Sequence, residues 1–311
     1  MKSVVSYPDR GTGGNSKYRG NCSPKLIEDI ITQYKLKGLN DYMVGSGTTE
    51  DVVRKMGLQG DFYDLNRGYD MLSMDIPQRA QNIFWHPPYD NIIIYSGEQY
   101  SAENVMREYG FDPRINDLSR CKNWDEFVKK MNYCCMKQFT SLEKGGRMFI
   151  LVGDIKKSRG GSRGRLYSMV NDIVKPGTLE QIIIKMQHNC VSDSRTYNGS
   201  FVPIVHEYLL VLKKESAVVI PVKWSRDYTY DVRDSQKVTW RDVLASIMQD
   251  YGEMPLSRIY SILEGHQKCQ GNPHWHEKVR QVLRAYPDIF KCTKKGCYAY
   301  QKSQRGESYV Y

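Results

Sequence analysis

The stretch LNDYMVGSGTT, residues 39–49, decides the fold. Residues 39–44 have the character of a short strand and run directly into a turn with two glycines, Gly45 and Gly47. Residues 50–56 have helical character, with acidic side chains near their start, where the helix dipole favours them. A strand, a glycine turn and a helix in this order predict the opening unit of an α/β domain.

The turn at residues 45–49 has the properties of a ligand-binding loop. It lacks the lysine of a phosphate-binding loop and the full spacing of the dinucleotide fingerprint. Its two glycines allow the backbone to approach a ligand closely, beside a helix N-terminus that suits a carboxylate. A plain structural turn can have the same composition, so the argument depends on what the neighbouring strands carry.

Two further strand candidates end in polar or rigid loops. Residues 61–65 form the first, and Asp64 near its end can accept hydrogen bonds from both hydroxyls of a ribose. Residues 82–85 form the second, directly before the HPPY loop at residues 86–89. Ligands of open α/β sheets bind at the carboxyl ends of the strands. A ligand with an amino-acid end and a nucleoside end would satisfy the glycine loop and Asp64 together, and S-adenosylmethionine is the obvious candidate.

The HPPY loop suits the binding of an amino group. Pro87 and Pro88 fix the backbone and leave the preceding carbonyls free as acceptors, because proline has no N–H. Tyr89 offers a flat face on which a planar base can stack. With His86, these residues could hold an amino group so that its lone pair faces an electrophilic methyl group. An ordinary loop between a strand and a helix is the alternative interpretation.

The α/β pattern continues through the first 214 residues. A helix opens at Ser23-Pro24, because serine can cap a helix and proline is tolerated in its first turn. Later strand candidates lie at residues 148–152, 181–186 and 207–212. We therefore predict a Rossmann-like α/β domain with a mostly parallel sheet over residues 1–214, followed by a linker over residues 215–237.

Residues 238–311 have a different pattern. Thr239 and Asp242 have the spacing of a capping box, and three helices with apolar faces follow. Residues 289–291 and 297–300 flank a basic turn in the manner of a two-stranded wing. This order predicts a small winged helix-turn-helix domain that binds duplex DNA.

Two sets of polar or basic side chains are candidates for contact with DNA. A basic loop can follow a phosphate backbone, and the polar face of the third helix could enter the major groove. A solvated surface would have the same composition in both places. The candidates are Arg159, Arg163 and Arg165 in the loop and Lys278, Arg280, Gln281 and Arg284 in the helix.

The C-terminal region also contains residue types that bind zinc. Their spacing matches no standard finger, and each also fits the winged-helix pattern as a core or wing residue. The residues concerned are Cys269, His274, His276, Cys292 and Cys297. We expect no metal site.

The composition is that of an ordinary globular protein, with 40% hydrophobic and 26% charged residues. A formal net charge of +10 favours a polyanionic partner, although a merely basic protein would have the same value. Residues 1–18 contain no apolar stretch that could act as a signal peptide, and the longest apolar runs are only strand-sized. Eight cysteines without a regular framework suit a reducing compartment, so the cytoplasm is the expected location.

Taken in order, these motifs resemble those of the DNA amino-methyltransferases, the family that makes N6-methyladenine or N4-methylcytosine. The resemblance covers roughly residues 15–214, and the cofactor motifs precede the catalytic loop, as in the gamma-like arrangement. Several motifs in the right order are a stronger signal than any one of them. The matching segments are YRGNCSP (18–24), DYMVGSGTT (41–49), DLN (64–66), HPPY (86–89), LEKGG (142–146), GD (153–154) and HEY (206–208).

The resemblance implies a methyltransferase that binds S-adenosylmethionine and flips its target base out of the duplex. The implied cofactor-binding residues are Ser23, Pro24, Asp41, Gly45, Ser46, Gly47, Thr48, Asp64 and Asn66. His86, the Pro87 carbonyl and Tyr89 would hold the base, with Pro88 completing the catalytic loop. Because only a neutral imidazole can accept the hydrogen bond, activity should fall as the pH drops through the pKa of His86.

The identity of the base depends on the first residue of the catalytic loop. The family usually has Asp, Asn or Ser there, so His86 departs from the pattern and makes adenine or cytosine harder to choose. Adenine is favoured, because Ser is the typical cytosine-type residue and the motif order suits adenine enzymes. N4-cytosine methylation, an RNA substrate and a non-catalytic DNA-binding regulator are the alternatives. A cognate restriction nuclease and the oligomeric state are left open.

Overall fold

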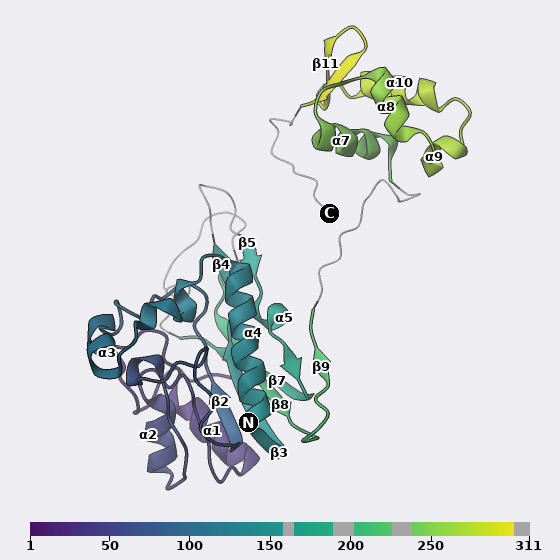
Figure 1. Cartoon of the computed structure of the whole chain (residues 1–311). Coiled ribbons are helices and arrows are strands. Elements are labelled where there is room, and N and C mark those ends of the chain that lie inside the picture. The colour runs from purple at the N-terminus through teal and green to yellow at the C-terminus, as the bar shows by residue number, and fades with distance from the viewer. Residues whose placement is uncertain (158–164, 189–201, 226–237, 302–311) are drawn as a thin grey trace. The chain divides into compact units, whose positions relative to one another are not determined.

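The computed structural model describes residues 1–157, 165–188, 202–225 and 238–301 (Figure 1). The chain divides into two compact units, Met1–Arg226 and Asp227–Tyr311. Of the predicted basic loop, Arg159 and Arg163 lie outside the described residues. Arg165 begins strand β5, which pairs antiparallel with β4, but its side chain is outside the description. β4 spans Ile155–Lys157 and β5 spans Arg165–Tyr167.

A five-stranded sheet forms the centre of the first unit. Its strands, in spatial order, are β1 (Val4–Val5), β7 (Thr178–Met186), β8 (His206–Lys213), β3 (Leu142–Val152) and β2 (Ala80–Trp85). β1 is parallel to β7 and β3 is parallel to β2, whereas β8 is antiparallel to both of its neighbours. One sheet therefore contains all of the strands that were predicted near residues 82, 148, 181 and 207.

The sheet continues beyond β2 through isolated bridges. Asn40 pairs in parallel with Ile83 of β2, and Asp41 pairs in parallel with Phe62. The segments predicted as strands at residues 39–44 and 61–65 thus lie beside β2, but they form single bridges instead of continuous strands. One reason is that the Asp41 carboxylate accepts the backbone N–H of Met43 at 3.0 Å, so the next ladder bond to Tyr63 comes from Val44 instead. With these two segments the sheet is mixed and mostly parallel, as predicted.

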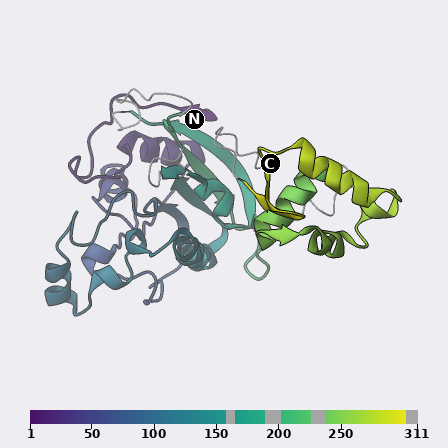
Figure 2. The ribbon, with the colours of Figure 1, turned by 90° about the horizontal axis from the view of Figure 1, so that it is seen from above.

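Helices cover both faces of this sheet. The long helix α4 (Trp124–Ser141) covers one face, and α1 (Pro24–Tyr34) and α2 (Thr48–Lys55) cover the other. Successive residues of β3 serve the two layers in turn, because strand side chains alternate. Ile150 packs in the core with α4, and Phe149 packs in the core with α1 and α2. Figure 2 shows this unit from a second direction, with α4 viewed nearly along its axis.

Short elements complete the first unit. They are α3 (Ala102–Tyr109), α5 (Met169–Asp172), the 3-10 turns η1 (Leu65–Arg67), η2 (Pro113–Ile115) and η3 (Leu118–Arg120), and the strands β6 (Lys175–Pro176) and β9 (Val222–Lys223). β9 pairs antiparallel with β6. Residues 222–223, which fall in the predicted linker, therefore belong to the first unit.

The second unit contains helices and a small antiparallel sheet. Its elements are α7 (Trp240–Tyr251), β10 (Met254–Pro255), α8 (Leu256–Leu263), α9 (Gln267–Gln270), α10 (Trp275–Ala285), β11 (Phe290–Lys294) and β12 (Cys297–Tyr300). The strand order is β10-β12-β11, so β10 adds a strand to the predicted pair. Thr239 caps α7 by accepting the N–H of Asp242. The winged-helix interpretation of this unit stays a prediction.

Two further expectations concern membranes and metals. None of the described helices is long and apolar enough to cross a membrane. Within the same residues, no group of three or more His, Cys, Asp or Glu side chains is placed to hold a metal ion. Of the suspected zinc ligands, Cys292 is exposed while Cys297 is buried.

Candidate active site

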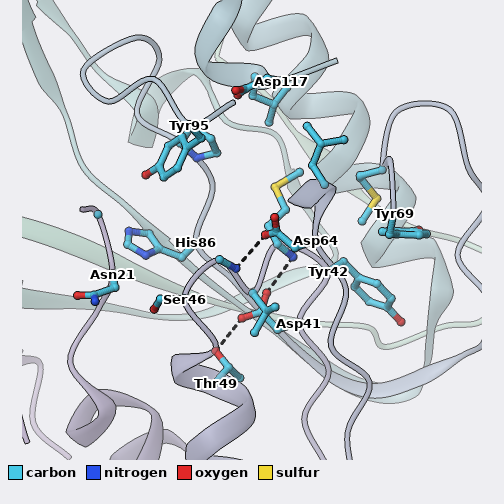
Figure 3. Close-up of a pocket in the computed structure, with 18 of the residues that line it drawn as sticks. Asn21, Asp41, Tyr42, Ser46, Thr49, Asp64, Tyr69, His86, Tyr95 and Asp117 are labelled. Carbon is cyan, nitrogen blue, oxygen red and sulfur yellow. Dashed lines mark hydrogen bonds between the residues drawn. The ribbon is translucent and has the colours of Figure 1, made fainter. Parts of the chain in front are cut away.

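A cavity lies at the carboxyl ends of β2 and of the segments at residues 39–44 and 61–65. It brings together seven residues that the sequence singled out, and Figure 3 shows several of them. These seven are Asp41, Gly45, Ser46, Thr48, Asp64, His86 and Pro88. The other predicted residues of the first unit lie beside the cavity without lining it, namely Ser23, Pro24, Gly47, Asn66, Pro87 and Tyr89.

Asp41 fixes the glycine loop through hydrogen bonds at both of its ends. Its side chain is buried, and its Oδ2 accepts a hydrogen bond from the Thr49 hydroxyl at 2.7 Å, drawn in Figure 3. Burial raises the pKa of Asp41 to about 7, although the hydrogen bonds from Thr49 and the Met43 backbone oppose this shift. The carboxylate therefore ties the end of one strand to the first turn of α2.

Asp64 links the glycine loop to the next strand segment. Its Oδ2 accepts the backbone N–H of Gly45 at 2.8 Å, and its Oδ1 accepts the N–H of Asn66 at 3.0 Å. Burial raises the pKa of Asp64, and these two hydrogen bonds oppose the rise. A carboxylate oxygen can accept two hydrogen bonds, so each oxygen of Asp64 keeps an acceptor position.

The glycine loop gives the N-terminus of α2 no side-chain cap. Gly45 and Gly47 have φ angles of 52° and 86°, which side chains rarely allow. Gly47 is the N-cap of α2 and provides no side-chain hydrogen bond to the first turn. The N–H groups of that turn and the helix dipole together favour an anion.

Arg10 approaches the same helix from the N-terminal segment. Its Nη2 lies 3.4 Å from the Thr48 hydroxyl, and its Nε is buried with no hydrogen-bond partner in the described part of the chain. Ser23 takes the N-cap position of α1, but its hydroxyl donates to the Arg10 carbonyl at 2.8 Å instead of accepting from the helix. Ser23 thus positions the segment that carries Arg10, a residue that sequence reasoning missed.

The HPPY loop enters a buried hydrogen-bond network. Nε2 of His86 lies 3.0 Å from the Tyr89 hydroxyl, and that hydroxyl donates to Oε1 of Glu207 at 2.8 Å. Oε2 of Glu207 accepts from Nζ of Lys185 at 2.6 Å. Lys185 in β7 and Glu207 in β8 stand opposite each other in the antiparallel register.

Burial sets the protonation of this network. It lowers the pKa of His86 to about 4, an effect that Glu207 opposes and Lys185 reinforces. Burial alone would raise the pKa of Glu207, but Lys185, His86 and the hydrogen bonds to Lys185 and Tyr89 leave it lowered. At neutral pH His86 is therefore a neutral imidazole and Glu207 is a carboxylate.

Tyr89 is not a free surface for stacking, because its hydroxyl and its ring both contact neighbouring groups. Its hydroxyl is held by Glu207, and a Cβ added to Gly153 would lie 2.8 Å from Cε2 of its ring. The absence of a side chain at Gly153 therefore gives Tyr89 its space. Tyr89 does not line the cavity, and its stacking on a base stays a prediction.

Sequence reasoning missed much of the cavity wall. Tyrosines form a large part of it, and Tyr18 stacks on Tyr95 with ring centroids 5.7 Å apart. Asp117 also lines the wall, where it accepts from the Ser96 hydroxyl at 2.6 Å. The signal for Lys185 and Glu207 was present, because each is a charged residue inside an apolar strand. The tyrosines of the wall are Tyr18, Tyr42, Tyr69, Tyr95 and Tyr100.

The residues of α10 that were predicted to contact DNA belong to the second unit. Arg280 donates to Glu277 at 2.6 Å and to the Tyr260 hydroxyl at 3.2 Å. Lys278 donates to Gln281 at 3.0 Å, and Arg284 is exposed. Arg284 thus has more freedom to meet a phosphate than Arg280.

The sheet order, the helical layers and the cavity beyond β2 define an α/β methyltransferase fold. Residues 80–303, more than half of the sequence, match the family model N6_N4_Mtase, described as DNA methylase. The chain therefore belongs to this DNA methylase family.

Solved structures with similar folds are distant in sequence. TTHA0409 from Thermus thermophilus, complexed with S-adenosyl-L-methionine, is 15% identical with a TM-score of 0.28, over 68% of this chain and 63% of that one. This chain thus spans less than two thirds of the length of TTHA0409. An S-adenosylmethionine-dependent methyltransferase from Clostridium acetobutylicum is 11% identical with a TM-score of 0.29, over 61% and 90% of the two chains. No curated protein matches the sequence.

Proposed function

We propose that this protein transfers a methyl group from S-adenosylmethionine to the N6 amino group of adenine in duplex DNA. The observation that carries the proposal is the meeting of His86 with the glycine loop and Asp64 in one cavity. The first feature offers an acceptor for an amino group, and the other two offer sites for a carboxylate and a ribose. Membership of the DNA methylase family supports DNA as the substrate.

The cavity fits the cofactor in two respects. The first turn of α2 lacks a side-chain cap, and the buried Nε of Arg10 lacks a partner among the described residues. A carboxylate bound at the first turn of α2 would satisfy its N–H groups, and Arg10, which contacts Thr48 without lining the cavity, would add a positive charge behind them. Asp64 has acceptor positions left for two hydroxyls.

These residues divide the binding of the cofactor between them. The α2 N-terminus, Ser46 and Thr48 would hold the amino-acid end, and Asp64 would hold the ribose. Asp41 would act from beneath by fixing the loop. When bound, the cofactor supplies an electrophilic methyl group.

The catalytic loop orients the nucleophile. His86 and the Pro87 carbonyl would accept the two N–H bonds of the amino group, which directs its lone pair toward the cofactor side of the cavity. Burial keeps the pKa of His86 at about 4, so the imidazole is an acceptor at neutral pH. Because a base inside a duplex cannot reach the cavity, it must be flipped out at a cost of a few kcal/mol. The tyrosine-rich wall provides surfaces on which such a base could stack.

The choice of adenine rests on the catalytic loop. Ser is the typical cytosine-type residue of the resembling family, and His86 stands at that position here. The net charge of +10 and the exposed Arg284 support contacts with phosphates.

The test is to incubate the protein with S-adenosylmethionine and mixed-sequence duplex DNA, digest the DNA to nucleosides and analyse them by mass spectrometry. N6-methyladenine is expected, lost in His86→Ala and kept in His188→Ala, because His188 contacts the Ser6 hydroxyl at 2.9 Å and does not line the cavity. N4-methylcytosine would overturn the choice of base but not the reaction. No methylated nucleoside in DNA, with cofactor binding intact, would overturn the DNA substrate and direct the assay to RNA.

A further inference from the structure

Four polar side chains, two of them buried and two partly buried, form a row that ends in the catalytic loop. The row runs from Lys185 to Glu207, then to the Tyr89 hydroxyl, and ends at Nε2 of His86. Lys185 and Glu207 are only 8% and 5% exposed. Burying such a pair without a role is costly, because two charges must leave water. Only His86 at the end of the row lines the cavity.

The number of hydrogens fixes the direction of every bond in the row. Lys185 can only donate, and the ionised Glu207 can only accept. The Tyr89 hydroxyl has a single hydrogen, which it gives to Glu207 at 2.8 Å. Its oxygen can therefore only accept from His86, so the hydrogen of the neutral ring must be on Nε2.

We infer that the Lys185–Glu207 pair acts through Tyr89 to hold His86 in the Nε2–H tautomer, leaving Nδ1 as a hydrogen-bond acceptor. Among the described residues, no protein group is hydrogen-bonded to Nδ1. The opposite tautomer would present an N–H donor to the substrate, and a donor repels the N–H groups of an amine. Lys185, Glu207 and Tyr89 are thus positioning residues, while His86 makes the contact. The inference depends on the proposed function only for the nature of the group that Nδ1 meets.

The groups around the His86 ring support this direction of the hydrogen bonds. The charged groups that act on His86 are Glu207, at 3.8 Å from Nε2, and Lys185 behind it. Burial, Glu207 and the neighbouring Tyr95 and Cys22 raise the pKa of Tyr89 well above its usual value. Tyr89 therefore keeps its hydrogen at any pH at which the enzyme would work, and the row keeps its direction.

Glu207→Gln tests the inference, because it changes the direction of the row without changing its shape. Lys185 would still donate to the amide oxygen, and the amide NH₂ would then donate to Tyr89. The Tyr89 hydroxyl would turn to His86, and the ring hydrogen would move to Nδ1. Tyr89→Phe is the second variant, since it removes the row's connection to His86. Glu180→Gln is the matched control, because Glu180 lies in β7, the strand that pairs with β8, but forms its ion pair with Arg147.

The measurement is the tautomer of His86, read from ¹⁵N resonances of histidine-labelled protein and assigned by their loss in His86→Ala. The wild type and Glu180→Gln are expected to have Nε2–H, and Glu207→Gln is expected to have Nδ1–H with a methylation rate at least about 100-fold lower. Tyr89→Phe should contain a mixture of both tautomers. Nδ1–H in the wild type, or an unchanged tautomer in Glu207→Gln, would overturn the inference. Because the tautomer is read without substrate, failure of the proposed function would appear separately, as an inactive wild type with the expected resonances.

Discussion

The carboxylate of Asp64 accepts the backbone N–H of Gly45 at 2.8 Å. This bond joins the end of one strand segment to the glycine loop that follows the neighbouring segment. The loop and the proposed ribose site are thereby held in a fixed relation before any ligand arrives. Preorganisation of this kind lowers the cost of ordering a site on binding.

Replacing Asp64 should therefore weaken cofactor binding in two ways. Asp64→Ala removes the acceptor for the ribose and also frees the Gly45 N–H. We expect the Kd for S-adenosylmethionine, measured by calorimetry, to rise by roughly 10- to 100-fold, since hydrogen bonds to a charged group contribute about 1.5–3 kcal/mol. Asp75→Ala, at an exposed aspartate, is the control. An unchanged Kd in Asp64→Ala would remove Asp64 from the site.

Arg10 should also contribute to the affinity for S-adenosylmethionine, at the amino-acid end of the ligand. We expect Arg10→Ala to raise the Kd by about 10-fold, because a charged donor near the α2 N-terminus is lost. Lys17→Ala removes an exposed cation from the same segment and should have no effect. Methylthioadenosine has no carboxylate, so its affinity should be the same in Arg10→Ala and the wild type. Equal losses for both ligands would show that Arg10 acts on the loop and not on the carboxylate.

The sequence predicted those parts of the site that depend on the order of strands and loops along the chain. Asp64 and the HPPY loop each follow a strand segment, and parallel segments bring their carboxyl ends to one edge. Lys185 and Glu207 could not be paired in advance, because their contact depends on the register of β7 against β8. Arg10 lies outside every recognised motif, and its place depends on how the N-terminal segment folds back over α2.

The pKa of Asp41 predicts how stability depends on pH. Burial raises this pKa to about 7, so the folded protein keeps a proton that the unfolded chain loses near pH 4. The stability contributed by the protonated group is complete below about pH 4 and is lost as the pH rises through 7. Asp41→Asn cannot ionise, so its free energy of unfolding should improve relative to the wild type as the pH rises across this window, by at most about 1.4 kcal/mol per pH unit.

Urea unfolding of both proteins at several pH values measures this difference. Asp75→Asn, at an exposed position, is the control and should follow the wild type at every pH. A constant difference between Asp41→Asn and the wild type from pH 4 to pH 8 would contradict the raised pKa.

Arg284 should affect DNA affinity through phosphates. It is exposed on α10, and one lost phosphate contact should lower the dependence of log Kd on log salt by about one. Arg284→Ala should show this change with any DNA sequence. Lys129→Ala removes one exposed cation from α4 and is the matched control. Equal effects of the two variants would indicate a general response to net charge instead of a contact by α10.

The rate of methylation should begin to fall at a lower pH than the sequence alone predicts. An ordinary histidine would lose activity as the pH falls through about 6.5. Burial lowers the pKa of His86 to about 4, while Glu207 opposes and Lys185 reinforces the shift. Since the neutral ring is the acceptor, the rate should stay level from pH 8 to about pH 5 and fall about 10-fold per unit below the pKa. Single-turnover rates with bound cofactor and DNA measure this directly.

Lys185→Met is the variant that changes this profile in a defined direction. Lys185 lowers the pKa of His86, so its removal should move the fall in rate to higher pH. The same change leaves Glu207 without its partner, so folding of the variant must be verified by its free energy of unfolding. Lys130→Met, which breaks an ion pair with Glu126 on α4, is the control for the loss of a lysine. A fall in the wild-type rate near pH 6.5, or an unchanged profile in folded Lys185→Met, would show that the buried network does not govern the protonation of His86.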